Sequence, residues 1–289
     1  MKNEIINRKN NEKIEERSPK GASFLYDNIF GRVILYFARK RFVSRIAGKY
    51  MDTKLSCRHI DSFIKNNNIN MSDYPKTEYK SFNEFFSRKI IPSKRTFSKK
   101  DTDFISPADS KLLVYKITED KTFTIKEKIY TIEEILRDKK LAKEYKNGYF
   151  LVFRLSVDDY HRYSFVDDGE VMSTKKITGA FHTVGPIAFK RYKVYSENNR
   201  EYQVLKTKNF GDIIQMEVGA LMVGKIVNHD ITKFNRGDEK GYFLFGGSTI
   251  VVMVKENIIE IDEDILKNSN HNIETKIQIG EKVGKRVVK

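Results

Sequence analysis

The sequence contains no tryptophan, one cysteine and only five prolines among its 289 residues. The lone Cys57 excludes an internal disulfide and a thiolate metal cluster. The five histidines include no H-E-x-x-H pair, so no metal site is expected. No apolar run reaches the roughly 18 residues that a membrane-spanning helix needs, and residues 1–20 lack the apolar stretch of a signal peptide. The chain is therefore expected to face the cytosol.

Several common catalytic signatures are also missing. The sequence has no G-x-x-x-x-G-K-[ST] phosphate loop, no G-x-G-x-x-G at a strand–helix junction and no G-x-S-x-G motif. It has no zinc-finger spacing and no basic stripe interleaved with exposed aromatic residues, so a nucleic-acid partner is not expected. Common nucleotide and hydrolase chemistries are thereby disfavoured.

What the chain does have is positive charge, with a net +15 and a pI near 9.5. Residues 1–58 carry 14 Lys and Arg against 6 Asp and Glu, a net +8. Such an excess favours an anionic partner. Within this region, residues 24–47 repeat apolar residues at helical spacing, with basic residues between them. This helix could lie in the headgroup layer of an anionic bilayer or pack its apolar stripe on the protein core, and the pattern alone favours neither.

The distribution of residue types along the chain predicts an α+β fold in three parts. Residues 1–20 are expected to form a solvated polar tail, residues 21–100 a helical, basic region, and residues 101–289 a β-rich core. Strands are predicted where β-branched and aromatic runs alternate with turn residues: 111–117, 121–125, 148–157, 212–227 and 241–254. One helix is predicted over 131–146, with Thr131 as its cap and Glu134 completing a capping box.

Three short segments could carry chemistry, and each also has an ordinary structural explanation. Gly246-Gly247-Ser248-Thr249 lies between two strong strands and is compatible with a simple hairpin or bulge. The alternative is a strained corner at which a hydroxyl can face its own preceding carbonyl. The segment 106–110 (SPADS) reads as a turn before a strand, and 158–163 (DDYHRY) holds a lone histidine of the kind that is usually structural.

Together these segments resemble phosphatidylserine decarboxylases, in which the same motifs occur in the same order. The resemblance extends to residues 85–88 (FFSR) with Pro92, to residues 181–184 (FHTV), typical of the Gram-positive, clostridial-like branch, and to residues 218–226 (VGALMVGKI). It covers about residues 21–255. The combination of motifs is specific, and agreement by chance is not expected.

The resemblance implies a self-cleaving, pyruvoyl-dependent enzyme that converts phosphatidylserine to phosphatidylethanolamine and CO₂ in phospholipid biosynthesis. Cleavage between Gly247 and Ser248 would give a large β chain, 1–247, and a small α chain, 248–289. Ser248 Oγ would attack the Gly247 carbonyl, and elimination and loss of ammonia would leave a covalent pyruvoyl group. That group replaces an external cofactor by forming a Schiff base with the substrate amine.

Family position assigns a relay to three residues of this chain. Ser248 is the nucleophile and the source of the pyruvoyl group, His161 is the base that activates it, and Asp109 orients the imidazole. A serine hydroxyl needs such a base, and a carboxylate can fix the base's tautomer. No metal is implied.

The match departs from the family at one position that bears on this relay. Many members read YHRxH, whereas the second histidine is replaced here by Ser164. His161 could serve both cleavage and decarboxylation, or His182 could supply the second imidazole, and His182 is also compatible with a packed strand residue. The corner reads GGST where LGST is frequent, which keeps the required Gly-Ser-Thr.

The implied substrate is an anionic lipid, so the basic N-terminal helix is expected to dock the enzyme peripherally on the cytoplasmic side of the cell membrane. Lys190, Arg191 and Lys193 are candidates for holding the lipid phosphate only because they are basic. Two alternatives stay open: a pyruvoyl decarboxylase of a soluble amino acid, and a membrane-binding, non-catalytic β-domain with an inert GGST turn. The expected partners are phosphatidylserine in the membrane and, after cleavage, the chain's own α and β fragments. The oligomeric state stays open, and a homo-oligomer is one alternative.

Overall fold

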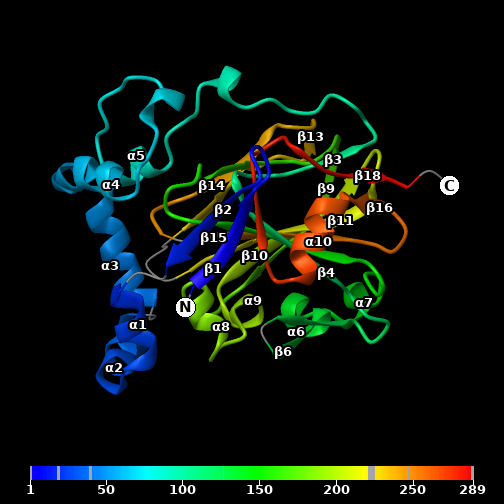
Figure 1. The fold of residues 1–289 in the computed structure, drawn as a ribbon, viewed down its shortest axis with the longest axis horizontal. Helices are drawn as coiled ribbons and strands as arrows, with labels where there is room; N and C mark the ends of the chain where they lie inside the picture. The colour runs from blue at the N-terminus through cyan, green and yellow to red at the C-terminus, as the bar shows by residue number, and fades with distance from the viewer. Residues whose placement is uncertain are drawn as a thin grey trace.

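A ten-stranded, almost entirely antiparallel sheet organises the fold (Figure 1). The computed structural model describes residues 2–17, 20–38, 41–125, 127–220, 225–246 and 248–287. The strand order is β13-β9-β10-β11-β15-β7-β4-β17-β1-β2, and only the β1–β17 pair is parallel. The expected combination of helices with a large sheet is therefore confirmed. The strands of this sheet are β1 (Lys2–Asn7), β2 (Glu12–Arg17), β4 (Ser110–Lys116), β7 (Tyr149–Leu155), β9 (Gly169–Ile177), β10 (Arg200–Thr207), β11 (Gly211–Val218), β13 (Lys233–Phe234), β15 (Ser248–Val254) and β17 (Glu274–Ile277).

The two central strands, β7 and β15, are apolar on both sides and buried, because both faces of the sheet are covered. Successive residues of β15 enter different cores: Val251 and Met253 face one, whereas Ile250 and Val252 face the other. The first core is covered by short helices, and the second by two small sheets and a helix. A third cluster, rich in phenylalanine, lies among the N-terminal helices.

The smaller sheets and the helices of the β-rich part complete these layers. One sheet holds β12 (Ile226–Asn228), β14 (Glu239–Phe243) and β8 (Arg162–Ser164), and another holds β16 (Ile259–Ile261), β18 (Lys282–Arg286) and β3 (Asp103–Ile105). A hairpin pairs β5 (Thr122–Ile125) with β6 (Lys128–Thr131). The helices are α6 (Ile132–Leu136), α7 (Lys139–Lys143), α8 (Pro186–Phe189), α9 (Val194–Glu197) and α10 (Glu263–Asn270).

The N-terminal region is helical, as predicted, but residues 24–47 do not form one helix. The described segments are α1 (Lys20–Asp27), α2 (Ile29–Ala38) and α3 (Arg41–Met51), followed by α4 (Ile60–Asn66), α5 (Phe82–Phe86) and the 3-10 turns η1 (Lys54–His59), η2 (Met71–Asp73) and η3 (Pro92–Lys94). The chain turns at Asn28, whose Oδ1 accepts a hydrogen bond from Phe30 N at 2.8 Å. An asparagine side chain that caps the next helix in this way ends the previous one.

The helix predicted over 131–146 is also divided, into α6 and α7. Thr131 caps α6 as predicted, accepting from Glu134 N at 3.0 Å. Arg137 then adopts a left-handed conformation (φ 47°), and Asp138 caps α7 by accepting from Leu141 N at 3.0 Å. The second cap satisfies the backbone of a new first turn, which explains the break.

The polar tail predicted over residues 1–20 is wrong for most of that segment. Residues 2–17 form the hairpin β1–β2, and β1 adds to the sheet beside β17. The apolar Ile5 is buried, and Arg8 forms ion pairs with Asp262 and Asp264. The hairpin is therefore an integral edge of the sheet, and its alternating charges leave the outermost strand polar.

Candidate active site

The Gly246–Thr249 corner joins two different sheets. The strand before it, β14, belongs to the three-stranded sheet with β8 and β12, and the strand after it, β15, is central in the large sheet. The hairpin interpretation is therefore wrong. Gly246 has φ 135°, a conformation that favours glycine, and Gly247 lies outside the described residues. Ser248 begins β15 and pairs with Leu155 at the end of β7.

The three segments singled out in the sequence converge at this corner. Ser164, at the end of β8, donates its backbone N–H to Pro107 O of the SPADS turn at 2.9 Å. The carbonyl of His161 accepts from Phe243 N, in the strand that leads into the corner, at 3.0 Å. Backbone bonds thus tie the histidine segment both to the SPADS turn and to the strand before the corner.

Four side-chain atoms at this junction are buried with no hydrogen-bond partner among the described residues: Ser248 Oγ, Thr249 Oγ1, His161 Nε2 and Ser164 Oγ. Ser248 and His161 are 0% and 1% exposed. An unsatisfied buried polar atom costs about 1–3 kcal/mol, so folding alone does not favour such an arrangement. Two of the four, Ser248 Oγ and His161 Nε2, belong to residues that the sequence assigned to the relay.

The ring of His161 is held in a defined orientation. Its Nδ1–H donates to the backbone carbonyl of Asp159 at 2.8 Å, and the ring centroid lies 4.1 Å from that of Phe86. Burial lowers the pKa of His161 to about 3. The imidazole is therefore neutral near pH 7, with its proton on Nδ1 and a free lone pair on Nε2, which is the form a general base requires.

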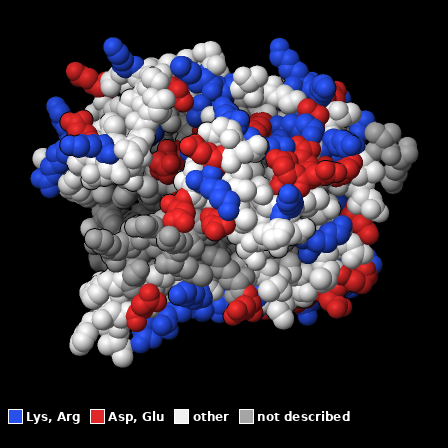
Figure 2. All heavy atoms as spheres, in the orientation of Figure 1, with Lys and Arg blue, Asp and Glu red and all other residues white. Residues whose placement is uncertain are grey.

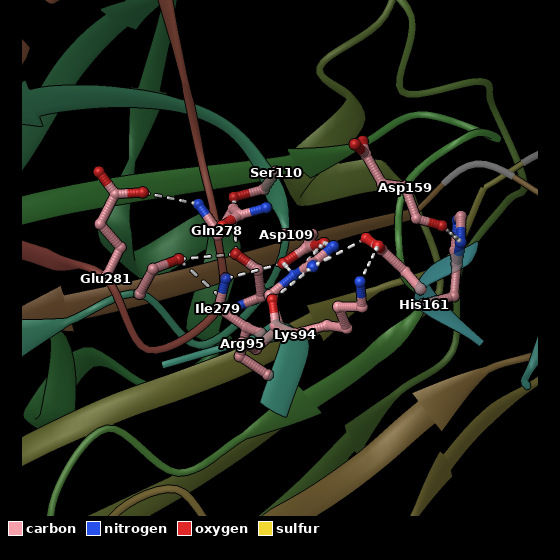
Figure 3. A network of polar contacts seen from close by, with 12 residues as sticks. Lys94, Arg95, Asp109, Ser110, Asp159, His161, Gln278, Ile279 and Glu281 are labelled. Atoms are coloured by element: carbon pink, nitrogen blue, oxygen red, sulfur yellow. Dashed lines mark hydrogen bonds and ion pairs between the residues drawn. The ribbon is translucent and has the colours of Figure 1, made fainter. Parts of the chain in front are cut away.

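Asp109 is held by a different set of contacts, shown in Figure 3. Its carboxylate accepts three hydrogen bonds from Arg95, at 3.0, 3.0 and 2.6 Å, and a fourth from Ile279 N at 2.8 Å. Burial opposes the charge of Arg95, but the bonds to Asp109 outweigh it and raise the pKa of Arg95. In the described structure no hydrogen bond joins Asp109 to His161, and the carbonyl of Asp159 fixes the tautomer instead.

Asp159 and Lys111 form a second buried pair beside the histidine, which the sequence interpretation did not identify. Lys111 Nζ donates to Asp159 Oδ2 at 2.5 Å, and Ser156 N donates to the same oxygen at 2.7 Å. Burial raises the pKa of the Asp159 carboxyl to about 6, although the charge of Lys111 opposes the shift. Asp159 lies in the DDYH motif, so the sequence could have indicated it. Lys111 lies on β4, far away in the sequence, and no motif connects it with this histidine.

His182 lies in a separate environment. It is buried, its ring stacks on Tyr192 with centroids 3.8 Å apart, and its Nε2 is 3.6 Å from Glu197 Oε2. Ser164, at the position of the second family histidine, is also buried, and its hydroxyl has no partner in the described part of the chain.

The basic candidates near residue 190 differ in their surroundings. Lys190 and Arg191 are exposed, whereas Lys193 forms an ion pair with Glu134 at 3.1 Å.

Comparison with known proteins identifies the family. The family model described as phosphatidylserine decarboxylase matches residues 82–285. The chain is 58% identical to phosphatidylserine decarboxylase proenzyme 2 of Clostridium acetobutylicum over 262 residues, 90% of each chain. It is 44% identical to the phosphatidylserine decarboxylase proenzyme of Clostridium tetani over 86% of each chain, and 42% identical to that of Fusobacterium nucleatum over 97% of each. The chain therefore belongs to the phosphatidylserine decarboxylase family.

Proposed function

We propose that this chain cleaves itself between Gly247 and Ser248 and then decarboxylates phosphatidylserine to phosphatidylethanolamine at the surface of a membrane. The proposal rests on the family and on one observation: the hydroxyl of Ser248 and the Nε2 of His161 are buried near the same junction, and neither has a partner among the described residues. A nucleophile and a base held without other partners are available to each other during the reaction.

The cleavage chemistry follows from these two groups. His161 Nε2 takes the hydroxyl proton while Ser248 Oγ attacks the carbonyl carbon of Gly247. The C–N bond breaks as the nitrogen is protonated, which leaves an ester. Removal of the Ser248 Cα proton then expels the Gly247 carboxylate, and water releases ammonia from the resulting dehydroalanine.

The site suits the keto acid that this sequence of steps would leave. Residue 248 is fully buried at the start of the central strand β15, and the β15 pairing with β7 and β11 would hold the new chain end in place. The pyruvoyl carbonyl supplies an electron sink for the charge left when CO₂ departs. The low exposure favours a reaction in which a carboxylate loses its charge.

For Asp109 the contacts favour an indirect role. Its carboxylate connects Arg95, which follows η3, to Ile279, in the segment expected to become the α chain. We infer that Asp109 holds the SPADS turn in place, which Pro107 O ties to the histidine segment through Ser164 N, and thereby supports cleavage without touching the imidazole.

Membrane docking is supported by the surface of the N-terminal helices. Six large apolar side chains on α2 and α3 are 53–73% exposed: Ile29, Phe30, Val33, Ile34, Phe42 and Ile46. The protruding end formed by α2 is largely uncharged in Figure 2. No described helix meets the length and apolarity needed to cross a bilayer. An exposed apolar face of this size, with basic residues in the same segment, fits the headgroup layer better than water.

Helix α1 connects the N-terminal helices to the catalytic part of the chain. Tyr26 of α1 is buried, and its hydroxyl accepts from Thr183 N, in the FHTV segment, at 2.9 Å. Docking of the helices would therefore place the enzyme core on the cytoplasmic surface of the membrane.

Intact mass of the purified chain tests the cleavage. We expect two fragments, of residues 1–247 and 248–289, and a carbonyl-reactive probe on the smaller one. Ser248→Ala should give a single full-length species that retains its fold. A wild-type chain that stays whole yet releases CO₂ from phosphatidylserine would overturn the mechanism.

Vesicle binding tests the docking. Charge reversal at Arg39, Lys40 and Arg41 should weaken sedimentation with anionic vesicles, and added salt should weaken wild-type binding in the same way. Arg39 and Lys40 lie outside the described residues. Unchanged binding would indicate that this segment does not face the membrane.

A further inference from the structure

We propose that Arg88 is the principal ligand for the phosphodiester of the lipid headgroup. This inference rests on the proposed function for its substrate, and it assigns a role to a residue that the relay does not use. Arg88 follows α5 in the FFSR segment and is only 5% exposed. Its Nη1 donates to Phe85 O at 3.1 Å, whereas Nε and Nη2 have no partner among the described residues.

A buried guanidinium with two unused donors is unfavourable unless something else pairs with it. The described neighbours of Arg88 are aromatic: its guanidinium carbon lies 4.1 Å from the ring centroid of Tyr74 and 4.6 Å from that of Phe85. Stacking fixes the plane of the guanidinium, and the Tyr74 hydroxyl also interacts with it, but no described atom lies within hydrogen-bond geometry of Nε or Nη2. A planar fork held in this way is organised in advance for two oxygens of one anion.

A cleft of about 320 Å³ lies beside this group. Its lining includes Thr77, Tyr79, Glu84, Arg88, Lys89 and Arg162. Arg162 is already engaged, by Glu239 at 2.6 Å and by Ser87 O at 2.7 Å, and Glu84 accepts from Lys80 N. Lys89 is exposed, and no described carboxylate pairs with it. The cleft therefore retains an excess of positive charge and has room for a headgroup.

The cleft also lies between the two parts of the proposed machinery. Phe86, two residues before Arg88, contacts the ring of His161, and the charge of Arg88 contributes to lowering the pKa of that imidazole. On the other side, α5 belongs with α4 and α3 to the helical group that carries the exposed apolar surface (Figure 1). A lipid entering from the docked membrane would bring its phosphate to this point before its serine reaches Ser248.

The substrate carries two anionic groups, and the chemistry favours the phosphate at Arg88. A cation paired with the carboxylate would stabilise the charged ground state, and this stabilisation would be lost as neutral CO₂ forms. The phosphate keeps its charge throughout, so the same contact binds the substrate without opposing the reaction.

Direct binding to the uncut Ser248→Ala chain tests the site without relying on catalysis. We expect calorimetry to show binding of glycerophosphoserine and of glycerol 3-phosphate, with an affinity about 10- to 100-fold lower, on the order expected for charged hydrogen bonds, when Arg88→Met is added. Arg88→Lys keeps the charge but not the fork and should lose part of this affinity. Lys65→Met, which removes an exposed charge on α4 away from the cleft, is the matched control and should change nothing.

Binding of free serine, which carries the carboxylate but no phosphate, distinguishes the two anionic groups of the substrate. If Arg88 determines serine binding but not glycerol 3-phosphate binding, the site holds the carboxylate and the proposal is overturned. Equal affinities for glycerol 3-phosphate with and without Arg88 would also overturn it. Should Arg88→Met fail to fold, as judged by thermal unfolding, Arg88→Lys decides: full retention of affinity refutes the proposal. A wild-type chain that never cleaves would count against the proposed function while leaving these binding results intact.

Discussion

The rate of self-cleavage should be nearly independent of pH between 8 and 5. His161 Nε2 must be unprotonated to accept the Ser248 proton, and burial lowers the pKa of this imidazole to about 3. At pH 5 an ordinary imidazole with a pKa near 6.5 would be about 3% neutral, and a rate that depended on it would fall about 30-fold from its plateau. His161 stays almost wholly neutral at that pH, so the rate should change less than twofold.

The fold should survive over the same range, because two groups act in opposite directions. Between pH 6.5 and 3 the unfolded chain protonates His161 and the folded chain does not, so the free energy of unfolding falls as pH falls, by up to about 5 kcal/mol. Asp159 has its pKa raised to about 6, so protonation below pH 6 favours the folded chain by about 3 kcal/mol. These limits are reached only near pH 3. At pH 5 the two contributions are about 2 and about 1 kcal/mol, so the net loss over the tested range is at most about 1 kcal/mol, small against the roughly 5–15 kcal/mol typical of a folded protein.

Cell-free synthesis followed by rapid transfer into buffers of different pH would measure the rate as the loss of full-length chain on denaturing gels. Circular dichroism of Ser248→Ala over the same buffers locates acid unfolding, and His161→Ala should abolish cleavage at every pH. A one-proton decline with its midpoint between pH 6 and 7, in buffers where the fold is intact, would refute the assignment of a buried, neutral His161 as the base.

Four further outcomes are expected. Asp109→Asn should slow cleavage and lower the free energy of unfolding by about 3 kcal/mol, because it weakens a buried pair with Arg95; normal processing of this variant would exclude Asp109 from the machinery. Phe30→Ser removes an apolar side chain that is 73% exposed, whose insertion into lipid is worth at most about 3 kcal/mol, and should reduce vesicle binding about tenfold or more, whereas Ile129→Ser, equally apolar but on β6, should not. Gly31→Ala would place a Cβ 1.9 Å from Phe24 O, so limited proteolysis should become faster within α1 and α2. Thr131→Ala should lower the free energy of unfolding by about 1 kcal/mol through loss of the α6 cap, seen as a lower midpoint in denaturant without a change in slope.

The sequence predicted those elements whose patterns are local. The apolar runs of β7 and β15 are continuous because both sides of each strand are buried, and Thr131 together with Glu134 indicates where a helix begins. The hairpin β1–β2 could not be predicted in this way. Its strands are rich in lysine and glutamate, and β1 is ordered by pairing with β17, which lies near the opposite end of the chain.

The site shows the same division. The motif order singled out Ser248, His161 and Asp109 as candidates, because each lies in a short characteristic segment. Their partners come from the fold: Arg95 binds Asp109, and the carbonyl of Asp159 holds His161. No sequence pattern connects Arg95 with the SPADS turn, because the fold brings them together. The contacts of the predicted residues could therefore be identified only from the structure.

The segment after the corner, 248–289, contributes strands to separate positions in the large sheet. It supplies β15 between β11 and β7, and β17 between β4 and β1, and its Ile279 N donates to Asp109. Two products of a cut at the corner would stay interlocked and separate only when the whole sheet melts. A chain truncated before β17 and β18 would lack strands that support the corner. We therefore expect such a truncated chain not to cleave itself.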